Sequence, residues 1–364
     1  MASYQKRGKT WQYTISNKGN PIRKGGFRTK AEAAAEATRI ESDLNKGLIP
    51  HLKLEPFDEY FENWINVYKQ HVNKNTRERY KTSLETIKEA FEGKPIQHIK
   101  KQEYQMLLNE YGRTRSRATV SKFNSHVRAC VKEAIDEGII KMDFTRNIKL
   151  TGLDGKSSAD KHLNYNDSEK LLKALYSRLD GGITYYLLFL ALTSGMRFAE
   201  IVGLTRNDFD FSNNTITIDK TWGYTKRMRE GFGPTKNKQS VRVIKMDKRT
   251  MHLFKQLFFK TPDNLHRLVF YSPNSKYKVI SNAAANKLLK KTLHDLGIDP
   301  ISVHGLRHTH ASILLYKKVS IYYVSERLGH GDIETTLGEY SHVIKELREE
   351  DENASAEVYE QMLV

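Results

Sequence analysis

Apolar and polar residues alternate near the start of the chain, a pattern typical of β-strands. The alternation flanks a polar Asn-Lys-Gly-Asn turn and involves Trp11, Tyr13, Ile15, Ile22 and Phe27. It predicts a β-hairpin with basic side chains on one face. Thr29-Lys-Ala-Glu32 then has the form of a capping box, which begins an Ala-rich helix expected to end at Gly47. Residues 1–50 are therefore predicted to form a three-stranded sheet supported by one helix.

From Pro56 onward the apolar residues follow helical spacing. We predict four helices: one that begins at Pro56, one that is capped by Asn75 and ends at Phe91, one that includes 103–108, and one that spans 116–137. The first carries an aromatic stripe, which is typical of the core of a helical bundle. A stretch rich in Gly, Ser and charge at 151–160 predicts a linker. Residues 55–152 are therefore expected to form a separate helical domain.

The rest of the chain, 160–345, has a mixed pattern. It predicts helices at 166–179 and 183–203, strands at 215–218 and 241–244, and further helices up to residue 345. The tail 346–364 contains seven acidic residues and one basic residue, Arg348. The predicted fold class is a multidomain, mainly α protein with small β-sheets, whose third domain is mixed α+β.

The excess of basic residues in the chain indicates a negatively charged binding partner. The 364 residues carry a formal net charge of +17. Eight of the first 31 residues are Lys or Arg, and none of them is acidic. Such a balance favours a polyanionic partner, with nucleic acid first and an anionic membrane surface second. A solvated basic terminus is the alternative reading of the first segment.

Cysteine content and hydropathy narrow the class of protein further. A single cysteine, Cys130, excludes an internal disulfide framework and a cysteine-based zinc site, and it favours a reducing compartment. The first residues contain no apolar segment of the kind found in signal peptides. The longest apolar run, 183–192, is too short to span a bilayer. We therefore expect a cytoplasmic protein without membrane contact.

Five short motifs in the third domain have a common chemistry. They contribute Arg197 after a glycine, Lys236 in a polar turn, His304 and Arg307 one helical turn apart, His330 after Leu-Gly, and Tyr340 ten residues later. Two arginines can hold one phosphodiester through charge-assisted hydrogen bonds. His and Lys transfer protons, and Tyr is an oxygen nucleophile. No dense carboxylate cluster accompanies them, so the set predicts metal-free phosphoryl transfer through a phosphotyrosine.

Simpler readings of the individual residues stay open. Arg197 can pair with Glu200 on a helix surface. His304 and His308 have the spacing of zinc ligands, but the glutamate of the HExxH motif is missing, so His308 and His310 are read as local hydrogen-bonding or core residues. Lys238 could take the role of Lys236, because it would share a face with Lys236 on a regular strand.

The ordered set of motifs resembles the tyrosine recombinase (phage integrase) family. The resemblance implies an arm-type DNA-binding domain at 1–50, a core-binding domain at 55–152 and a catalytic domain at 160–345. It also implies that Tyr340 attacks the scissile phosphate to form a 3′-phosphotyrosine, while Arg197 and Arg307 neutralise the transition state. Lys236 would protonate the departing 5′-oxygen, His304 would assist proton movement at the tyrosine, and His330 would hydrogen-bond the phosphate.

The resemblance implies partners as well. These are double-stranded DNA with core and arm attachment sites, a homotetramer on that DNA linked through the tail, an excisionase and a DNA-bending host protein. It implies no cofactor and no metal. The candidate DNA-contacting residues are Arg23, Lys24 and Arg28 near the second strand of the hairpin, Arg115, Arg117 and Lys122 on the fourth helix, and Arg242. The alternatives are a type IB topoisomerase and a catalytically idle DNA-binding regulator.

Overall fold

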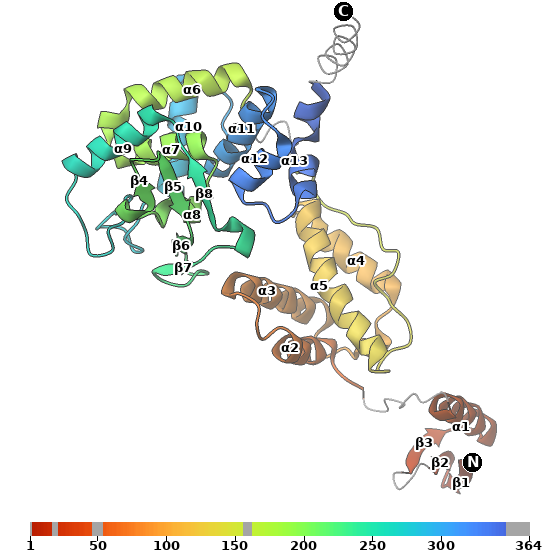
Figure 1. The fold of residues 1–364 in the computed structure, drawn as a ribbon. Coiled ribbons are helices and arrows are strands. Elements are labelled where there is room, and N and C mark those ends of the chain that lie inside the picture. Colours follow the sequence, from red (N-terminus) through yellow and green to blue (C-terminus); the bar gives the residue numbers. More distant parts are fainter. Residues whose placement is uncertain (1, 17–20, 46–53, 156–161, 347–364) are drawn as a thin grey trace, which may run out of the picture. The chain divides into compact units, whose positions relative to one another are not determined.

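The chain folds into two compact units, Met1–Gly155 and Lys156–Val364. In the computed structural model, residues 2–16, 21–45, 54–155 and 162–346 are described (Figure 1). The expected helix end at Gly47, the second half of the linker at 151–160 and nearly all of the tail at 346–364 lie outside these residues. The described part contains no helix that is both long and apolar enough to cross a membrane.

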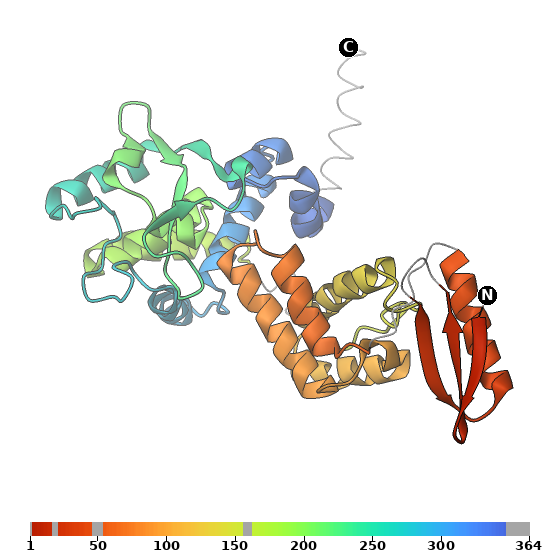
Figure 2. The same ribbon diagram turned by 90° about the horizontal axis from the view of Figure 1, so that it is seen from below.

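The N-terminal segment is a three-stranded antiparallel sheet with one helix. The elements are β1 (Ala2–Arg7), β2 (Thr10–Ile15), β3 (Ile22–Phe27) and α1 (Lys30–Asn45), and the strand order is β1-β2-β3. Helix α1 covers one face of the sheet (Figure 2) and buries Tyr13, Ile15, Ala33, Ala37 and Ile40. The Glu32 amide donates to Thr29 Oγ1 at 3.1 Å, and the Glu32 carboxylate accepts from the Thr29 amide at 3.4 Å. The predicted sheet, helix and capping box are confirmed.

The next segment is a helical bundle. Its helices are α2 (Phe57–Tyr68), α3 (Lys74–Phe91), α4 (Lys101–Gly112) and α5 (Arg117–Asp136). The predicted aromatic stripe is core, since Phe57, Phe61 and Trp64 are buried against one another and against the other helices. The predicted cap of α3 was misplaced: Asn73, not Asn75, accepts from the Thr76 amide at 2.8 Å. Asn73 has the extended backbone that an N-cap requires, whereas Asn75 is already helical.

The C-terminal unit is mixed α+β. Its helices are α6 (Tyr165–Ser177), α7 (Ile183–Ser194), α8 (Phe198–Val202), α9 (Lys248–Lys260), α10 (Asn282–Asp295), α11 (Val303–Tyr316), α12 (Ile321–Leu328) and α13 (Ile333–Glu346). Its strands are β4 (Phe209–Asp210), β5 (Thr215–Ile218), β6 (Lys220–Trp222), β7 (Phe232–Pro234) and β8 (Arg242–Lys245). One sheet has the order β4-β5-β8, and β6 and β7 form a separate antiparallel pair. The predicted strands at 215–218 and 241–244 correspond to β5 and β8, while β4, β6 and β7 were not anticipated.

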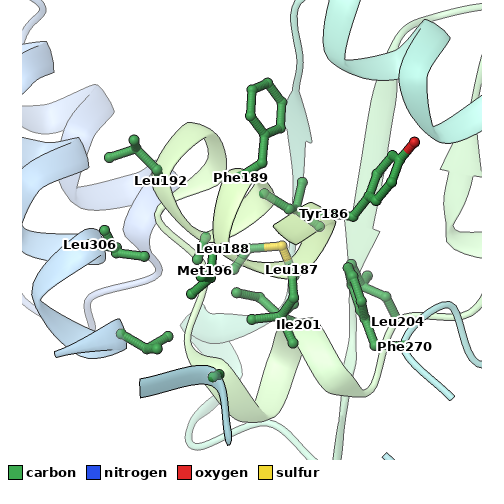
Figure 3. Close-up of a cluster of buried hydrophobic side chains, with 14 of the residues drawn as sticks. Tyr186, Leu187, Leu188, Phe189, Leu192, Met196, Ile201, Leu204, Phe270 and Leu306 are labelled. Atoms are coloured by element: carbon green, nitrogen blue, oxygen red, sulfur yellow. The ribbon is translucent and has the colours of Figure 1, made fainter. Parts of the chain in front are cut away.

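Helix α7 lies at the centre of this unit. It is apolar almost all round and is buried by the surrounding helices and sheet, as the cluster around Leu187, Leu188 and Met196 shows (Figure 3). Such a helix fits only in the interior of a domain, because no face of it favours water. Packing in the core therefore fixes the position of α7. It also fixes where the turn after α7 begins.

The single helix expected over 183–203 is wrong. Helix α7 ends at Ser194, and the chain turns through Gly195, whose φ of 68° is left-handed, before α8 begins at Phe198. A Cβ atom at position 195 would lie 2.6 Å from Cδ2 of His310, so only glycine allows the approach. This turn sets the position of Arg197, which immediately precedes α8.

Candidate active site

Arg197 is held by three parts of the C-terminal unit. Its Nη1 donates to Glu200 Oε1 at 2.9 Å and to Ser240 Oγ at 3.0 Å, and its Nη2 donates to the carbonyl of Gly329 at 3.0 Å. These partners come from α8, from the turn that precedes β8, and from the end of α12. The side chain remains 22% exposed. The guanidinium is therefore fixed in direction while part of it faces out of the fold.

Glu200 supplies the negative charge beneath this guanidinium. Its side chain is 1% exposed, and its second oxygen accepts from Nη2 of Arg242 at 3.0 Å. Burial alone would raise the pKa of Glu200, but the adjacent Arg242 and Arg197 hold that pKa below its ordinary value. The ion pair proposed as the simpler reading of Arg197 is thus present. It orients Arg197 within the pocket, by which we mean the interacting group Arg197, Arg307, His330 and Tyr340.

Arg242 lies inside the fold, contrary to the expectation that it faces DNA. Its side chain is 6% exposed. Besides Glu200, it donates to the carbonyl of Arg327 at 2.6 Å and to that of Ser240 at 2.8 Å. A basic residue on a strand reads as exposed in the sequence, but here a buried carboxylate from α8 compensates its charge. Arg242 is a structural support of the pocket.

Arg307 carries a donor that the fold does not satisfy. The residue is 3% exposed, and its Nη1 donates to the carbonyl of Gly195 at 2.9 Å. Its Nη2 is buried and has no hydrogen-bond partner in the described part of the chain. Burial, reinforced by the positive charge of Arg197, lowers the pKa of Arg307 to about 9. A buried donor without an acceptor is energetically unfavourable. A bound anion would supply the acceptor and would also compensate the positive charge of Arg307.

His330 lies in the same pocket. Gly329 takes the left-handed conformation with φ of 68° and ends α12, as its Leu-Gly-His motif predicts. His330 Nδ1 lies 2.7 Å from Thr336 Oγ1. Burial, together with the charges of Arg307 and Arg197, lowers the pKa of His330 to about 4. The imidazole is therefore neutral near pH 7 and can donate one hydrogen bond without adding charge.

Tyr340 reaches this pocket from α13. Its side chain is 1% exposed, and its hydroxyl lies 2.9 Å from Nδ1 of His308 on α11. His304, in the exposed first turn of α11, stacks edge to face on His308 with ring centres 4.8 Å apart. The Tyr340 hydroxyl also acts electrostatically on Arg307, which has an unsatisfied donor. This combination suits nucleophilic attack on a phosphate diester.

Comparison with known proteins assigns this arrangement to a family. Residues 161–346 match the phage integrase family, and residues 56–111 match the phage integrase N-terminal SAM-like domain. The chain belongs to the phage integrase family. Two relatives are similar to this integrase-family chain over nearly its whole length. The integrase of Staphylococcus phage L54a is 25% identical, covering 86% of this chain and 96% of the relative. The XerC-like tyrosine recombinase of Caldanaerobacter subterraneus subsp. tengcongensis is 24% identical, covering 94% and 95%.

Solved structures share the fold of this integrase-family chain. The integrase of the Tn1549 transposon, in complex with transposon right end DNA, superposes with a TM-score of 0.66 at 18% identity, covering 81% of this chain and 99% of that chain. A lambda integrase tetramer bound to a Holliday junction superposes with a TM-score of 0.55 at 17% identity, covering 88% and 89%. The predicted multidomain fold class and the predicted family are confirmed.

Lys236 is not on a strand. It is exposed in the segment between β7 and β8, and Lys238 begins a short 3₁₀ turn, Lys238–Ser240. The two lysines therefore do not share one face of a regular strand, which was the reason to consider them interchangeable. The Asn237 side chain caps this turn by accepting from the Ser240 amide at 3.0 Å. Since Ser240 also accepts from Arg197, the lysine-bearing segment is anchored to the pocket at one end.

His310 is a core residue, in agreement with the local role expected for it. Its Nδ1 is 2.9 Å from the carbonyl of Leu192, and its Nε2 accepts from Nε of Arg327 at 3.0 Å. Both ring nitrogens are therefore occupied. Within residues 2–16, 21–45, 54–155 and 162–346, no three His, Cys, Asp or Glu side chains form a group that could hold a metal ion.

The other candidate DNA contacts of this integrase-family chain lie in the first unit. Arg115, Arg117 and Lys122 are exposed at the start of α5 and just before it. The Arg115 guanidinium stacks on the ring of Tyr111, 4.1 Å from its centre. Arg23 and Arg28 are exposed, and Lys24 pairs with Glu36 on α1 at 3.4 Å.

Sequence reasoning assigned no active-site role to three residues that the structure places at the pocket. Glu200 and Ser240 orient Arg197, and His308 contacts Tyr340. The motifs did contain Glu200 and His308, each within three residues of a predicted arginine. Their roles depend on which side chains meet in space, and spacing along the chain does not reveal that.

Proposed function

We propose that this chain is a site-specific DNA recombinase that cuts and rejoins DNA through a 3′-phosphotyrosine on Tyr340. The observation that carries the proposal is the unsatisfied Nη2 of buried Arg307, beside Arg197 and within the same pocket as Tyr340. A scissile phosphate supplies the missing acceptor and also the atom that the tyrosine attacks. Membership of the phage integrase family supports the same reaction.

In this mechanism the arginines act on the transition state. Arg307 and Arg197 bind the two non-bridging oxygens, which gain negative charge as the phosphorus becomes pentacoordinate. Loss of one such prepositioned donor typically costs about 3–4 kcal/mol of transition-state stabilisation. Glu200 and Ser240 keep Arg197 in place before DNA arrives, so the enzyme does not need to order that side chain during the reaction.

The remaining residues move protons or bind the phosphate. Lys236 protonates the departing 5′-oxygen, His304 assists proton movement, and neutral His330 donates a hydrogen bond to a phosphate oxygen. The energy of the phosphodiester is kept in the phosphotyrosine bond. The 5′-hydroxyl of a second duplex then attacks this bond, releases Tyr340 and joins the new strands. The chemistry requires neither ATP nor a metal ion.

Covalent trapping tests this proposal. The full-length protein is incubated without Mg²⁺ with attachment DNA that carries a nick near the cleavage position, so that the 5′ fragment diffuses away. We expect a covalent protein–DNA adduct with wild type and none with Tyr340→Phe, which lacks only the hydroxyl. Tyr176→Phe is the matched control, because this tyrosine lies on α6 and is 44% exposed. An adduct that persists in Tyr340→Phe would refute the assignment.

The same assay separates the two alternatives. A catalytically idle regulator would bind the DNA without forming any adduct. A type IB topoisomerase would relax supercoiled DNA that lacks attachment sites, whereas we expect cleavage to depend on those sites. Direction control by an excisionase and bending of the DNA by a host protein belong to the same proposal, and both can be added to the reaction as purified components.

We propose that residues 1–50 bind arm sites through the face of the sheet that α1 leaves open. Strand register places Gln5 opposite Gln12, and Arg23 opposite Thr14, on that face. The two glutamine side chains are joined by a hydrogen bond of 3.0 Å. Arginine and glutamine are residues that read base edges in a major groove, and a β-sheet of this size can enter it.

The register distinguishes two neighbouring basic residues. Arg23 is on the open face, while Lys24 pairs with Tyr13 across the strands and lies on the face that α1 covers. Arg23→Ala should weaken arm-site binding and lower its salt slope by about one if Arg23 contacts a phosphate. Lys24→Ala, the matched control, should have a smaller effect. Equal losses in both variants would contradict the proposed orientation.

Exchange between two duplexes requires four strand cuts, so we propose that four protomers assemble on DNA. The structure of a lambda integrase tetramer on a Holliday junction supports four protomers, and the Tn1549 integrase complex supports DNA as the partner. In the bundle, Arg115, Arg117 and Lys122 would contact core-site phosphates. In this proposal residues 1–50 are the arm-binding domain, 55–152 the core-binding domain and 160–345 the catalytic domain.

The tail 346–364 would link neighbouring protomers, and the catalytic unit offers a surface for it. A hollow of about 460 Å³ lies between β8, an edge strand, and α12. Apolar side chains line much of it: Val241, Val243, Tyr322, Tyr323 and Ile333. The tail ends in Val-Tyr-Glu-Gln-Met-Leu-Val and is acidic, and the domain that carries the hollow is basic. An apolar and acidic segment therefore matches both the lining and the charge.

Two variants test this link. Truncation after Lys345 and Val243→Asp should both leave single-site binding intact and abolish recombination. Val67→Asp is the matched control, since Val67 and Val243 are 62% and 61% exposed and lie in different units. Recombination at the wild-type level by the truncated protein would refute the linking role of the tail.

A further inference from the structure

The side chain of Tyr340 is buried, with 1% of it exposed, and belongs to an apolar cluster. Tyr340 packs with Ala311, Leu315, Val324 and Leu328, all of which are buried. Its hydroxyl lies 2.9 Å from Nδ1 of His308, and the two rings are tilted at 51°. Water has little access to such a site, so a proton that leaves the hydroxyl must pass to a side chain.

His308 connects the nucleophile to the residues that hold the phosphate. It follows Arg307 directly on α11, and it lies one helical turn after His304, whose ring stacks on its own. The titratable and charged groups around it include His304 and Arg307 on α11, His330 beyond α12, and Tyr340 on α13. The proton of Tyr340 therefore begins next to an imidazole within the phosphate pocket.

Tyrosine is a poor nucleophile while it keeps its proton, because its pKa is ordinarily about 10. A general base is most effective when its pKa lies near the working pH, and imidazole, ordinarily about 6.5, meets this condition. Two other histidines nearby are less suited. The pKa of His330 is held at about 4 by burial and by Arg307 and Arg197, and both nitrogens of His310 are engaged in the core.

We propose that His308 is the catalytic base that accepts the proton of Tyr340. This inference rests on the proposed recombinase function. As the Tyr340 oxygen bonds to phosphorus, the O–H bond breaks, the proton moves to Nδ1 of His308, and the P–O5′ bond breaks with protonation of the 5′-oxygen by Lys236. On rejoining, the attacking 5′-hydroxyl gives its proton to the neutral Lys236 amine as its oxygen bonds to phosphorus. The imidazolium of His308 returns its proton to the tyrosine oxygen as the bond between that oxygen and phosphorus breaks. Protons and charges balance in both directions.

The test isolates the nucleophile from the leaving group. A nicked substrate with a 5′-bridging phosphorothiolate needs no protonation of its leaving sulfur, so the rate of adduct formation reports on the tyrosine side alone. The rate is measured from pH 5 to 10 for wild type and for His308→Asn. Asparagine can keep a hydrogen bond to the hydroxyl but does not take up a proton in this range. Circular dichroism and DNA affinity confirm that the variant is folded and bound.

We expect His308→Asn to form the adduct about 10²–10³-fold more slowly at pH 7, the usual contribution of a general base. The rate of the variant should rise with pH and approach that of wild type, because hydroxide replaces the missing base. A rate within about threefold of wild type at pH 7, or a loss of the same size at every pH, would overturn the proposal. Failure of the wild-type protein to form any Tyr340 adduct would instead refute the recombinase function itself.

Discussion

Replacing Glu200 by glutamine should strongly destabilise the C-terminal unit, although the two side chains have nearly the same shape. Glu200 is 1% exposed and accepts from both Arg197 and Arg242, at 2.9 and 3.0 Å. Glutamine keeps the shape and one acceptor oxygen, but it leaves buried Arg242 without a compensating charge. Removing one partner of a buried pair typically costs about 3–5 kcal/mol. With one acceptor retained, we expect the lower end of that range, about 3 kcal/mol.

For a unit of this size, about 3 kcal/mol corresponds to a fall in Tm of about 6–12 °C. Trp222 is buried in the C-terminal unit, and its fluorescence follows unfolding in a background where Trp11 and Trp64 are phenylalanine. Glu169→Gln is the control: its partner Lys173 lies at 2.8 Å, but the carboxylate side chain is 50% exposed, so the Tm should not change.

The pH dependence gives a second check on the same variant. The pKa of Glu200 is lower in the folded protein than its ordinary value. Its stabilisation is therefore complete above the pKa of the unfolded chain, about 4.3, and is lost as the pH falls through the folded-state pKa. The difference between wild type and Glu200→Gln should be largest near pH 7 and should shrink in acid. A Tm within experimental error of wild type, or a difference that grows in acid, would refute the reasoning.

Three further outcomes are expected. Lys236→Ala should lose cleavage of normal DNA and regain it on a 5′-bridging phosphorothiolate, whereas rescue of Lys238→Ala instead would move the acid by two residues. His330 should stay neutral down to a pH of about 4 in the protein without DNA. Its imidazole signals in NMR should therefore not titrate between pH 5 and 8. A titration midpoint near pH 6.5 would contradict the effect of its burial. Gly195→Ala should lower the unfolding free energy by about 2–3 kcal/mol and abolish the adduct. The reasons are the left-handed φ of 68° and the Cβ atom, which would lie 2.6 Å from His310. A fully active variant would show that the turn can relax.

The sequence determined the features that depend on neighbouring residues. The capping box at Thr29 and Glu32 and the glycine stop before His330 each involve fewer than five residues, so their physics is local. The aromatic stripe of α2 likewise follows from helical spacing alone. The ordered set from Arg197 to Tyr340 predicted the family because its residue types and their order are themselves the signal.

The tertiary structure decided what each charged residue does. In the sequence, Arg242 is interpreted as a surface residue. In the structure it is buried, because the buried carboxylate of Glu200 compensates its charge. Arg23 and Lys24 are adjacent, and strand register assigns them to opposite faces of the sheet. His304 carries the family motif, but it is His308, one turn later, whose ring nitrogen contacts Tyr340. In each case the outcome depends on groups that are distant along the chain, because the solvation and pairing of a charge are properties of the folded surroundings.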